Sequence, residues 1–445
     1  MLFVVNVAGI ISRRGLRVFA LAGILCAAGP AFGEGNPPPE LPIGTWLQGQ
    51  NRQDFPWHVE LGQSWLTFQQ RRYVQARITF RVRDLLRAGV SLRDLHLIVK
   101  LATEDGRWLQ GQSYSRFEPP PGLAAGDEIH SLTNLYVRPG SYGVAVMAYD
   151  AANHRGNLWR GPLRVGSLKD DPLAGIDRTL PQVEFLPAAL PLRLGRGRGL
   201  ASMITFDPWA LGQGELLLPV GNVRPVQVDI VANVSLSLAT DRRDSEAPDW
   251  EYQLNGATVL QISNALSQLN LKVGCVRFSA LDVRRQKVFA DHEDARTLDW
   301  SRLRQAIVGV NRNKIEVSTL AGQKHEPAFL AHYLEKLSAA PSQCQRDGPP
   351  PVHILIVVSD AFIFPNGTER TTVRPEITPV GLCYHLRLVP VAGARWDEIG
   401  TVLKPLHPLK VDFSDSVRFR KTLAQMITGI ENASRETGQP ARQED

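Results

Sequence analysis

The order of apolar and polar residues divides the chain into two parts with different predicted structure. Between residues 46 and 165, short runs rich in β-branched and aromatic residues alternate with Gly, Pro or Asp turns. Runs of this kind predict strands, and several in succession favour an antiparallel β-sandwich. Pro139-Gly140 predicts a tight turn before a strand that alternates faces through Tyr142 and Val144.

From residue 225 onward, apolar runs alternate with segments of helical periodicity. Residues 285–292 predict a short additional strand, antiparallel at an edge. Strands that are apolar throughout and alternate with helices indicate a mostly parallel sheet covered on both faces. We therefore expect a doubly wound α/β domain over residues 225–433. The runs read as buried strands are residues 225–235, 271–280, 352–362, 384–392 and 409–415.

Three other segments differ in composition from the two predicted domains. Residues 34–45 form a Pro-rich spacer, and residues 166–224 are dense in Pro and Gly and predict a structured linker. Within this linker, "GELLLPVG" is a candidate edge strand for a neighbouring sheet. Residues 434–445 contain only one Ala among polar residues, Pro and Gly, which predicts a disordered tail.

The first 33 residues have the composition of a secretory signal peptide. Three arginines precede the short apolar stretch "VFALAGILCAAGPAFG", which ends in small residues and is too short to span a membrane. We expect an exported protein, periplasmic or extracellular, with no membrane span in the mature chain. Sec export and twin-arginine export both remain open, since "SRRGLR" matches the second signal in part.

Charge and cysteine content narrow the possible functions. Loss of the leader lowers the formal charge from +6 to +3, because three arginines and no acidic residue are removed. So small an excess argues against a nucleic-acid partner. The mature cysteines are Cys275, Cys344 and Cys383, which allow at most one disulfide, and their pairing stays open.

Polar side chains stand where two predicted strands end. Asn233, Ser235 and Ser237 follow the first strand of the α/β domain, and Asp360 ends its most apolar strand. Ligands of open α/β sheets bind beyond the carboxyl ends of the strands, so these four residues are the candidate site.

The element order and these residues resemble the von Willebrand factor type A family. In that family the first strand ends in Asp-x-Ser-x-Ser, a later loop supplies a Thr, and the fourth strand supplies a second Asp. The resemblance implies a Mg²⁺-like ion to which a partner protein adds a carboxylate. Here Asn233 replaces the first carboxylate, and the loop around Ser318 and Thr319 lacks the usual Gly-Thr pair and is followed by Lys324 and His325.

The resemblance extends to exported bacterial proteins in which such a domain follows a β-rich module. The segment at residues 135–156 resembles the penultimate hairpin of immunoglobulin-like and fibronectin-type modules, which act as spacers or binding platforms. Both resemblances imply a protein that works through contact with a protein partner.

Three functions remain for the strand-end residues. The first is a scaffold or interaction role without a cofactor, in which the polar side chains satisfy the backbone of the loop. The second is a weak Mg²⁺- or Mn²⁺-dependent adhesion site, with Ser235 and Ser237 as direct ligands. The third is a serine hydrolase using Ser235 and His325, although no Gly-x-Ser-x-Gly motif is present. We predict the first, a non-enzymatic interaction protein.

Overall fold

A computed structural model of the 445-residue chain gives the fold. The predicted leader, most of the spacer and nearly all of the tail lie outside the residues that the structure describes. Only the backbone is described for 191–194, 202–205 and 249–255. The described residues are 41, 43–119, 123–186, 191–194, 202–205, 210–235, 249–310, 326–340, 344, 350–360, 375, 381–388 and 398–435.

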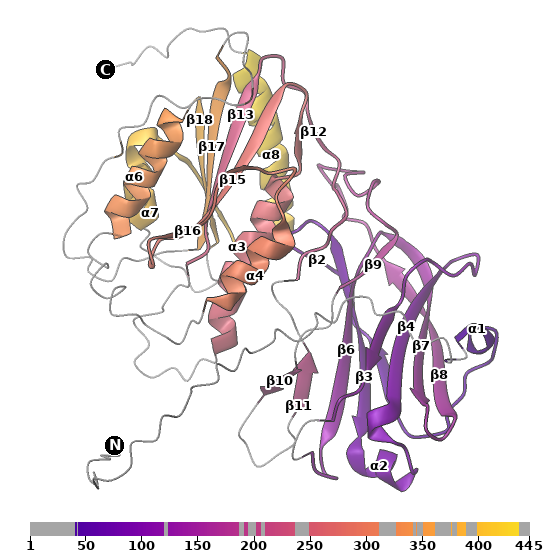
Figure 1. The fold of residues 1–445 in the computed structure, drawn as a ribbon. Helices are drawn as coiled ribbons and strands as arrows, with labels where there is room; N and C mark the ends of the chain where they lie inside the picture. Colours follow the sequence, from indigo (N-terminus) through magenta and orange to yellow (C-terminus); the bar gives the residue numbers. More distant parts are fainter. Residues whose placement is uncertain are drawn as a thin grey trace, which may run out of the picture.

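The N-terminal half consists of two packed β-sheets (Figure 1). Antiparallel strands make up the first sheet, in the order β5 (Ser113–Arg116), β4 (Leu95–Thr103), β7 (Gly140–Asp150) and β8 (Arg155–Val165). The second sheet has β3 (Arg72–Arg81) and β6 (Glu128–Val137) at its centre. Its other strands are β1 (His58–Leu61), β2 (Trp65–Leu66), β9 (Val183–Phe185), β10 (Pro191–Leu194) and β11 (Ser202–Thr205), so three strands after residue 165 complete it.

Alternation along the strands forms the core of this half. Ile78 and Phe80 of β3 face Val144 and Val146 of β7, and all four are almost fully buried. Tyr142 is on the same face of β7, as the sequence pattern predicts. The opposite face of β7 is covered by α1 (Ile43–Trp46). One strand differs from its sequence pattern: residues 76–85 have the composition of a single strand, but β3 ends at Arg81 and the chain continues as α2 (Val82–Arg87).

The C-terminal half contains a six-stranded mixed sheet. All neighbouring strands are parallel except β15 and β16, so the expected antiparallel edge strand is confirmed. The order is β16 (Lys287–Asp294), β15 (Gly274–Asp282), β13 (Val226–Asn233), β17 (Val352–Asp360), β18 (Leu382–Leu388) and β19 (Leu409–Phe413).

Helices cover both faces of this sheet (Figure 1), which explains why every residue of β13 is buried. One face packs against α3 (Asp249–Leu266), α4 (Trp300–Gly309) and α8 (Ser416–Arg435). The other packs against α6 (Glu326–Ala339) and α7 (Glu398–Leu403), which is followed by the short helix η3 (Lys404–Leu406). Asp299, a residue type that the sequence favours for capping, precedes α4 and accepts a hydrogen bond from the Arg302 amide at 2.9 Å.

A loop of the β-sandwich joins the two halves. Phe68 packs against Phe413 and Phe419 of the α/β half, with ring centroids 6.0 and 6.2 Å away. The buried Gln69 amide donates to Asn264 Oδ1 at 2.6 Å. The linker also contributes to this junction, because β12 (Leu218–Val220) pairs with β14 (Leu269–Leu271).

Candidate functional site

The carboxyl ends of β13 and β17 lie next to each other in the mixed sheet. Counted from β13, the six strands have the order 3-2-1-4-5-6, so these two strands flank the point where the order reverses. Ala232 pairs with Val358, which places Asn233 and Asp360 at the same edge. Ser235 follows β13 directly, whereas Ser237 lies outside the described residues.

Strand alternation separates the side chains of Asn233 and Asp360. Asn233 shares its face of the sheet with Val231, which packs against α6 and α7. Asp360 shares its face with Val358, which packs in the core formed with α3 and α8. The two strand ends are therefore neighbours, as the motif predicts, but the side chains of Asn233 and Asp360 lie on opposite faces of the sheet.

The Asn233 side chain holds the end of β13 against the turn after β15. Its Oδ1 accepts hydrogen bonds from Ser235 N at 3.2 Å, from Ser235 Oγ at 2.5 Å and from Val283 N at 3.5 Å. Ser235 Oγ in turn accepts from the Arg284 amide at 3.3 Å. Both side chains are almost fully buried. They satisfy backbone N–H groups that the strand ends leave unpaired.

A buried cluster of charges surrounds this turn. Arg284 is 8% exposed, and burial lowers its pKa, while Glu326, Asp282 and Glu398 oppose that shift. Asp282 also forms an ion pair with Arg285 at 2.9 Å. The edge therefore already contains a positive charge among its carboxylates.

Glu326, the first residue of α6, is the most perturbed acid of this cluster. It is fully buried, and neither carboxylate oxygen has a hydrogen-bond partner among the described residues. Burial raises its pKa to about 7, even though Arg284 acts in the opposite direction. The group therefore changes charge near neutral pH.

These donors fit a magnesium ion poorly. Mg²⁺ requires several oxygen ligands in octahedral geometry, usually with carboxylates among them. Asn233 is neutral, its oxygen already accepts hydrogen bonds, and the buried Arg284 opposes a second cation. Within the described ranges, no group of three or more His, Cys, Asp or Glu residues is arranged to hold a metal. Ser318, Thr319 and Lys324 lie outside those ranges.

A serine and a histidine do meet at this edge, but not the pair expected from the sequence. Ser359 Oγ lies 3.1 Å from His385 Nε2, and both residues are almost fully buried. Burial lowers the pKa of His385 to about 4, so its ring is neutral at pH 7. A substrate has no access to a fully buried serine, and the pair is best explained as a satisfied polar contact in the core. His325 lies outside the described residues.

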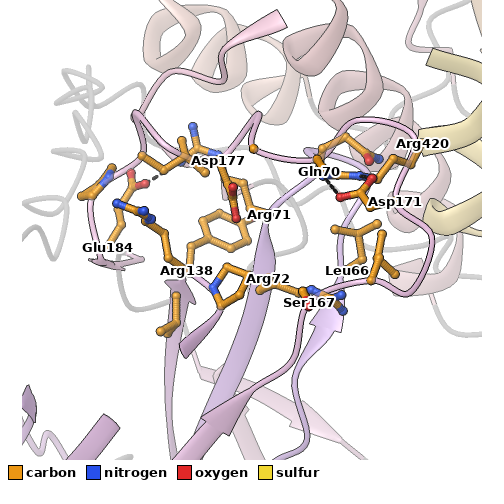
Figure 2. Close-up of a pocket in the computed structure, with 18 residues that line it drawn as sticks. Leu66, Gln70, Arg71, Arg72, Arg138, Ser167, Asp171, Asp177, Glu184 and Arg420 are labelled. Carbon is orange, nitrogen blue, oxygen red and sulfur yellow. Dashed lines mark hydrogen bonds and ion pairs between the residues drawn. The ribbon is translucent and has the colours of Figure 1, made fainter. Parts of the chain in front are cut away.

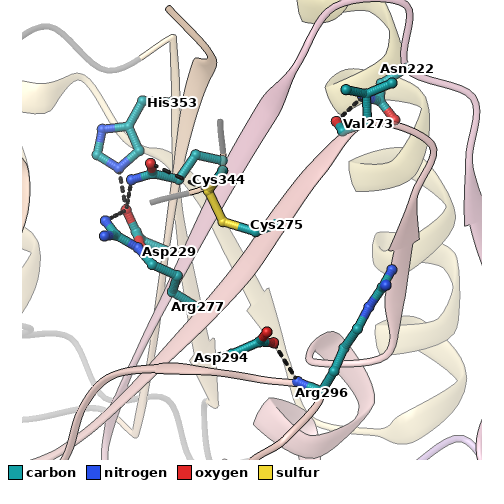
Figure 3. Close-up of a disulfide and its surroundings, with 10 residues drawn as sticks. Asn222, Asp229, Val273, Cys275, Arg277, Asp294, Arg296, Cys344 and His353 are labelled. Carbon is teal, nitrogen blue, oxygen red and sulfur yellow. Dashed lines mark hydrogen bonds and ion pairs between the residues drawn. A yellow bond between two sulfur atoms is a disulfide. The ribbon is translucent and has the colours of Figure 1, made fainter. Parts of the chain in front are cut away.

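A second polar cluster, which the sequence pattern did not predict, lies inside the sheet (Figure 3). Asp229 forms two hydrogen bonds with Arg277, at 2.6 and 2.9 Å, and Oδ2 also contacts His353 Nε2 at 2.5 Å and Gln227 Nε2 at 2.9 Å. Burial would raise the pKa of Asp229, but the hydrogen bonds from His353 and Arg277 outweigh it and lower the pKa to about 2. The sequence pattern that could have indicated this cluster is a single ionisable residue within each of three apolar strands.

One disulfide lies beside this cluster (Figure 3). Cys275 and Cys344 are bonded, with 5.3 Å between their Cα atoms, and Cys344 Sγ is 3.6 Å from Gln227 Oε1. Cys383 is free and buried, and burial raises its pKa to about 12. A thiol of this kind is unreactive at neutral pH.

Comparisons with known proteins leave the family of the chain undetermined. No protein-family model matches the sequence, and no curated protein matches it either. In the part of the chain that the structure describes, no helix is both long and apolar enough to cross a membrane. The fold is mixed α/β, with mostly antiparallel sheets in one half and a largely parallel sheet in the other.

Proposed function

We propose that this chain is an exported, non-enzymatic interaction or scaffold protein. Its C-terminal half would be a von Willebrand factor A-like domain that contacts a protein partner without a bridging metal ion. The main support for this proposal is the structure of the turn after β13. The side chains of Asn233 and Ser235 accept hydrogen bonds from backbone amides of Val283 and Arg284. The buried guanidinium of Arg284 lies among the nearby carboxylates.

Two further observations support the proposal. The strand order places this turn at the reversal point, where open α/β sheets present their binding surface. The disulfide between Cys275 and Cys344 fits an oxidising compartment and therefore a periplasmic or extracellular location.

A weak Mg²⁺- or Mn²⁺-dependent adhesion site is the second candidate. Asp282 and Glu326 favour it, because these two buried carboxylates lie beside the Asn233 turn, and Asp360 lies at the same edge on the opposite face of the sheet. Thermal unfolding of the full chain with Mg²⁺, Mn²⁺ or EDTA separates the candidates. A metal-independent protein should unfold at the same temperature in all three, and a rise with either metal would establish the second candidate instead.

Asn233→Asp makes the comparison sharper. We expect this variant also to show no dependence on Mg²⁺, because Arg284 still supplies the local positive charge. Asn270→Asp, at the exposed middle residue of β14, is the matched control, because it also adds a negative charge close to an arginine, Arg296.

Site-specific crosslinking in the native host tests the partner surface. A photoreactive residue at Lys287, next to the carboxyl end of β15, should give an adduct with a partner protein that persists in EDTA. The same residue at Arg87, exposed on α2, is the control position. Loss of the adduct in EDTA, or equal labelling at both positions, would contradict a metal-independent partner surface at this edge.

A further inference from the structure

A pocket of about 420 Å³ lies at the junction of the two halves (Figure 2). Residues from β6, from the linker and from α8 line it, so three parts of the chain that are distant in sequence meet there. The volume falls within the range usual for small-ligand sites, and such sites concentrate at domain junctions.

Two of its arginines are already paired with carboxylates. Arg71 Nη1 lies 2.5 Å from Glu184 Oε2, and Arg71 is almost fully buried. Arg420 forms two hydrogen bonds with Asp171, both at 2.6 Å, at the other end of the pocket (Figure 2). These two pairs build the walls and carry no net charge.

Two further arginines, Arg72 and Arg138, line the pocket without an ion pair to any described residue. Among the described lining residues Asp177 is the only other carboxylate, so four arginines face three acids and this described lining has a net charge of +1. Burial and the neighbouring Arg420 lower the pKa of Arg72, and Asp171 and Asp177 only partly oppose this shift. A ligand with negative charge would oppose it further.

Polar atoms of the wall also lack partners. Arg71 Nε and Gln70 Oε1 are buried without a hydrogen-bond partner among the described residues. Buried groups of this kind usually have a partner, which in a pocket is water or a ligand. The remaining lining is largely apolar and includes Leu66, Val137 and Leu180.

We propose that this pocket binds a small ligand with an oxyanion group, a carboxylate or a phosphate, held by the guanidinium groups of Arg72 and Arg138. Guanidinium presents a planar set of N–H donors that matches two oxygens of either group. Asp177 would accept a hydrogen bond from a hydroxyl or amine elsewhere on the ligand. A bound ligand would connect the β-sandwich, the linker and α8.

Calorimetric titration of the full chain tests this site. Citrate and inorganic phosphate are the two probes, in Tris-chloride buffer of low ionic strength, with sodium chloride at matched ionic strength as the blank. We expect saturable binding of one equivalent, weaker at high salt because exposed charges are screened. Binding of citrate alone identifies a carboxylate ligand, and binding of phosphate alone identifies a phosphate ligand.

Three variants assign the binding to the pocket. Arg138→Gln and Arg72→Gln should each weaken binding at least tenfold, because each removes one of the two guanidinium groups that hold the oxyanion. Neither change removes an ion pair with a described residue, so the variants should still fold. Arg87→Gln, which removes an exposed arginine of the same β-sandwich, should bind as the wild type does. Circular dichroism confirms that each variant is folded. Absence of saturable binding for both probes, or equal affinity in Arg138→Gln and Arg87→Gln, would overturn the proposal.

Discussion

Removal of one partner from the buried cluster around Asp229 gives the most direct test of how the α/β half is stabilised. Arg277→Met keeps an unbranched, apolar stem in place of the arginine methylenes but removes the guanidinium that holds both carboxylate oxygens of Asp229. Asp229 is 1% exposed, so bulk solvent does not reach its carboxylate. Among the described residues, His353 and Gln227 would remain as its side-chain donors.

The expected loss in the free energy of unfolding is about 3–5 kcal/mol, the usual cost of leaving one charge of a buried pair uncompensated. In a domain of this size, each kcal/mol lowers Tm by about 2–4 °C, so the transition should fall by about 6–20 °C. The free carboxylate can also take up a proton, which would limit the loss at acidic pH.

The pH dependence follows from the pKa of Asp229. It lies at about 2 in the folded chain, below the value of 3.8 for an unperturbed aspartate. The unfolded state therefore binds the proton first, and the stability from this group is complete above pH 4 and is lost as pH falls toward 2. In Arg277→Met this acid-dependent loss should shrink, because the folded-state pKa rises.

Unfolding in guanidinium chloride at pH 7, followed by tryptophan fluorescence, measures the change in the free energy of unfolding. Arg302→Met is the matched control, because Arg302 is an exposed residue of α4. The double variant Asp229→Asn, Arg277→Met should lose less than the sum of the single changes, because no charge is then left without its partner. A loss below about 1 kcal/mol in Arg277→Met would refute the view that the pair is buried and mutually dependent.

Three other predictions concern separate parts of the structure. Between about pH 4.5 and 7 the wild type should lose stability, because the Glu326 carboxyl ionises at lower pH in the unfolded state than in the folded state. Glu326→Gln should remove this loss. The stability of the variant relative to the wild type should therefore be ~3 kcal/mol higher at pH 8 than at pH 4, measured by urea unfolding at both pH values. Reduction of the disulfide, which joins residues 69 apart, should cost about 4 kcal/mol, and Cys344→Ser should reproduce that loss with no further effect of reductant. Phe68→Ala should cost about 3 kcal/mol and separate the unfolding of the two halves, so that calorimetry resolves two transitions; a single unchanged transition would contradict the role assigned to this contact.

The sequence by itself determined the kind of secondary structure in most segments and which strands are buried. Period-two alternation identified the strands of the first half, and continuous apolar runs identified the core strands of the second. The edge position of residues 285–292 and the cap at Asp299 were also predictable, because both depend on residues close in the chain. The helix after Arg81 was not predicted, since its six residues, VRDLLR, are too few to show a helical period within a β-rich region.

Only the tertiary structure decided which polar groups meet. Asp229, Arg277 and His353 stand on three different strands, and sequence alone gives no register between strands. The same holds for the cysteine pairing, for Arg284 beside the Asn233 turn, and for the pocket where the linker meets α8. The periodicity of apolar residues predicts whether a residue is buried. Its hydrogen-bond partner depends on how segments pack that can be more than a hundred residues apart, as with Gln69 and Asn264.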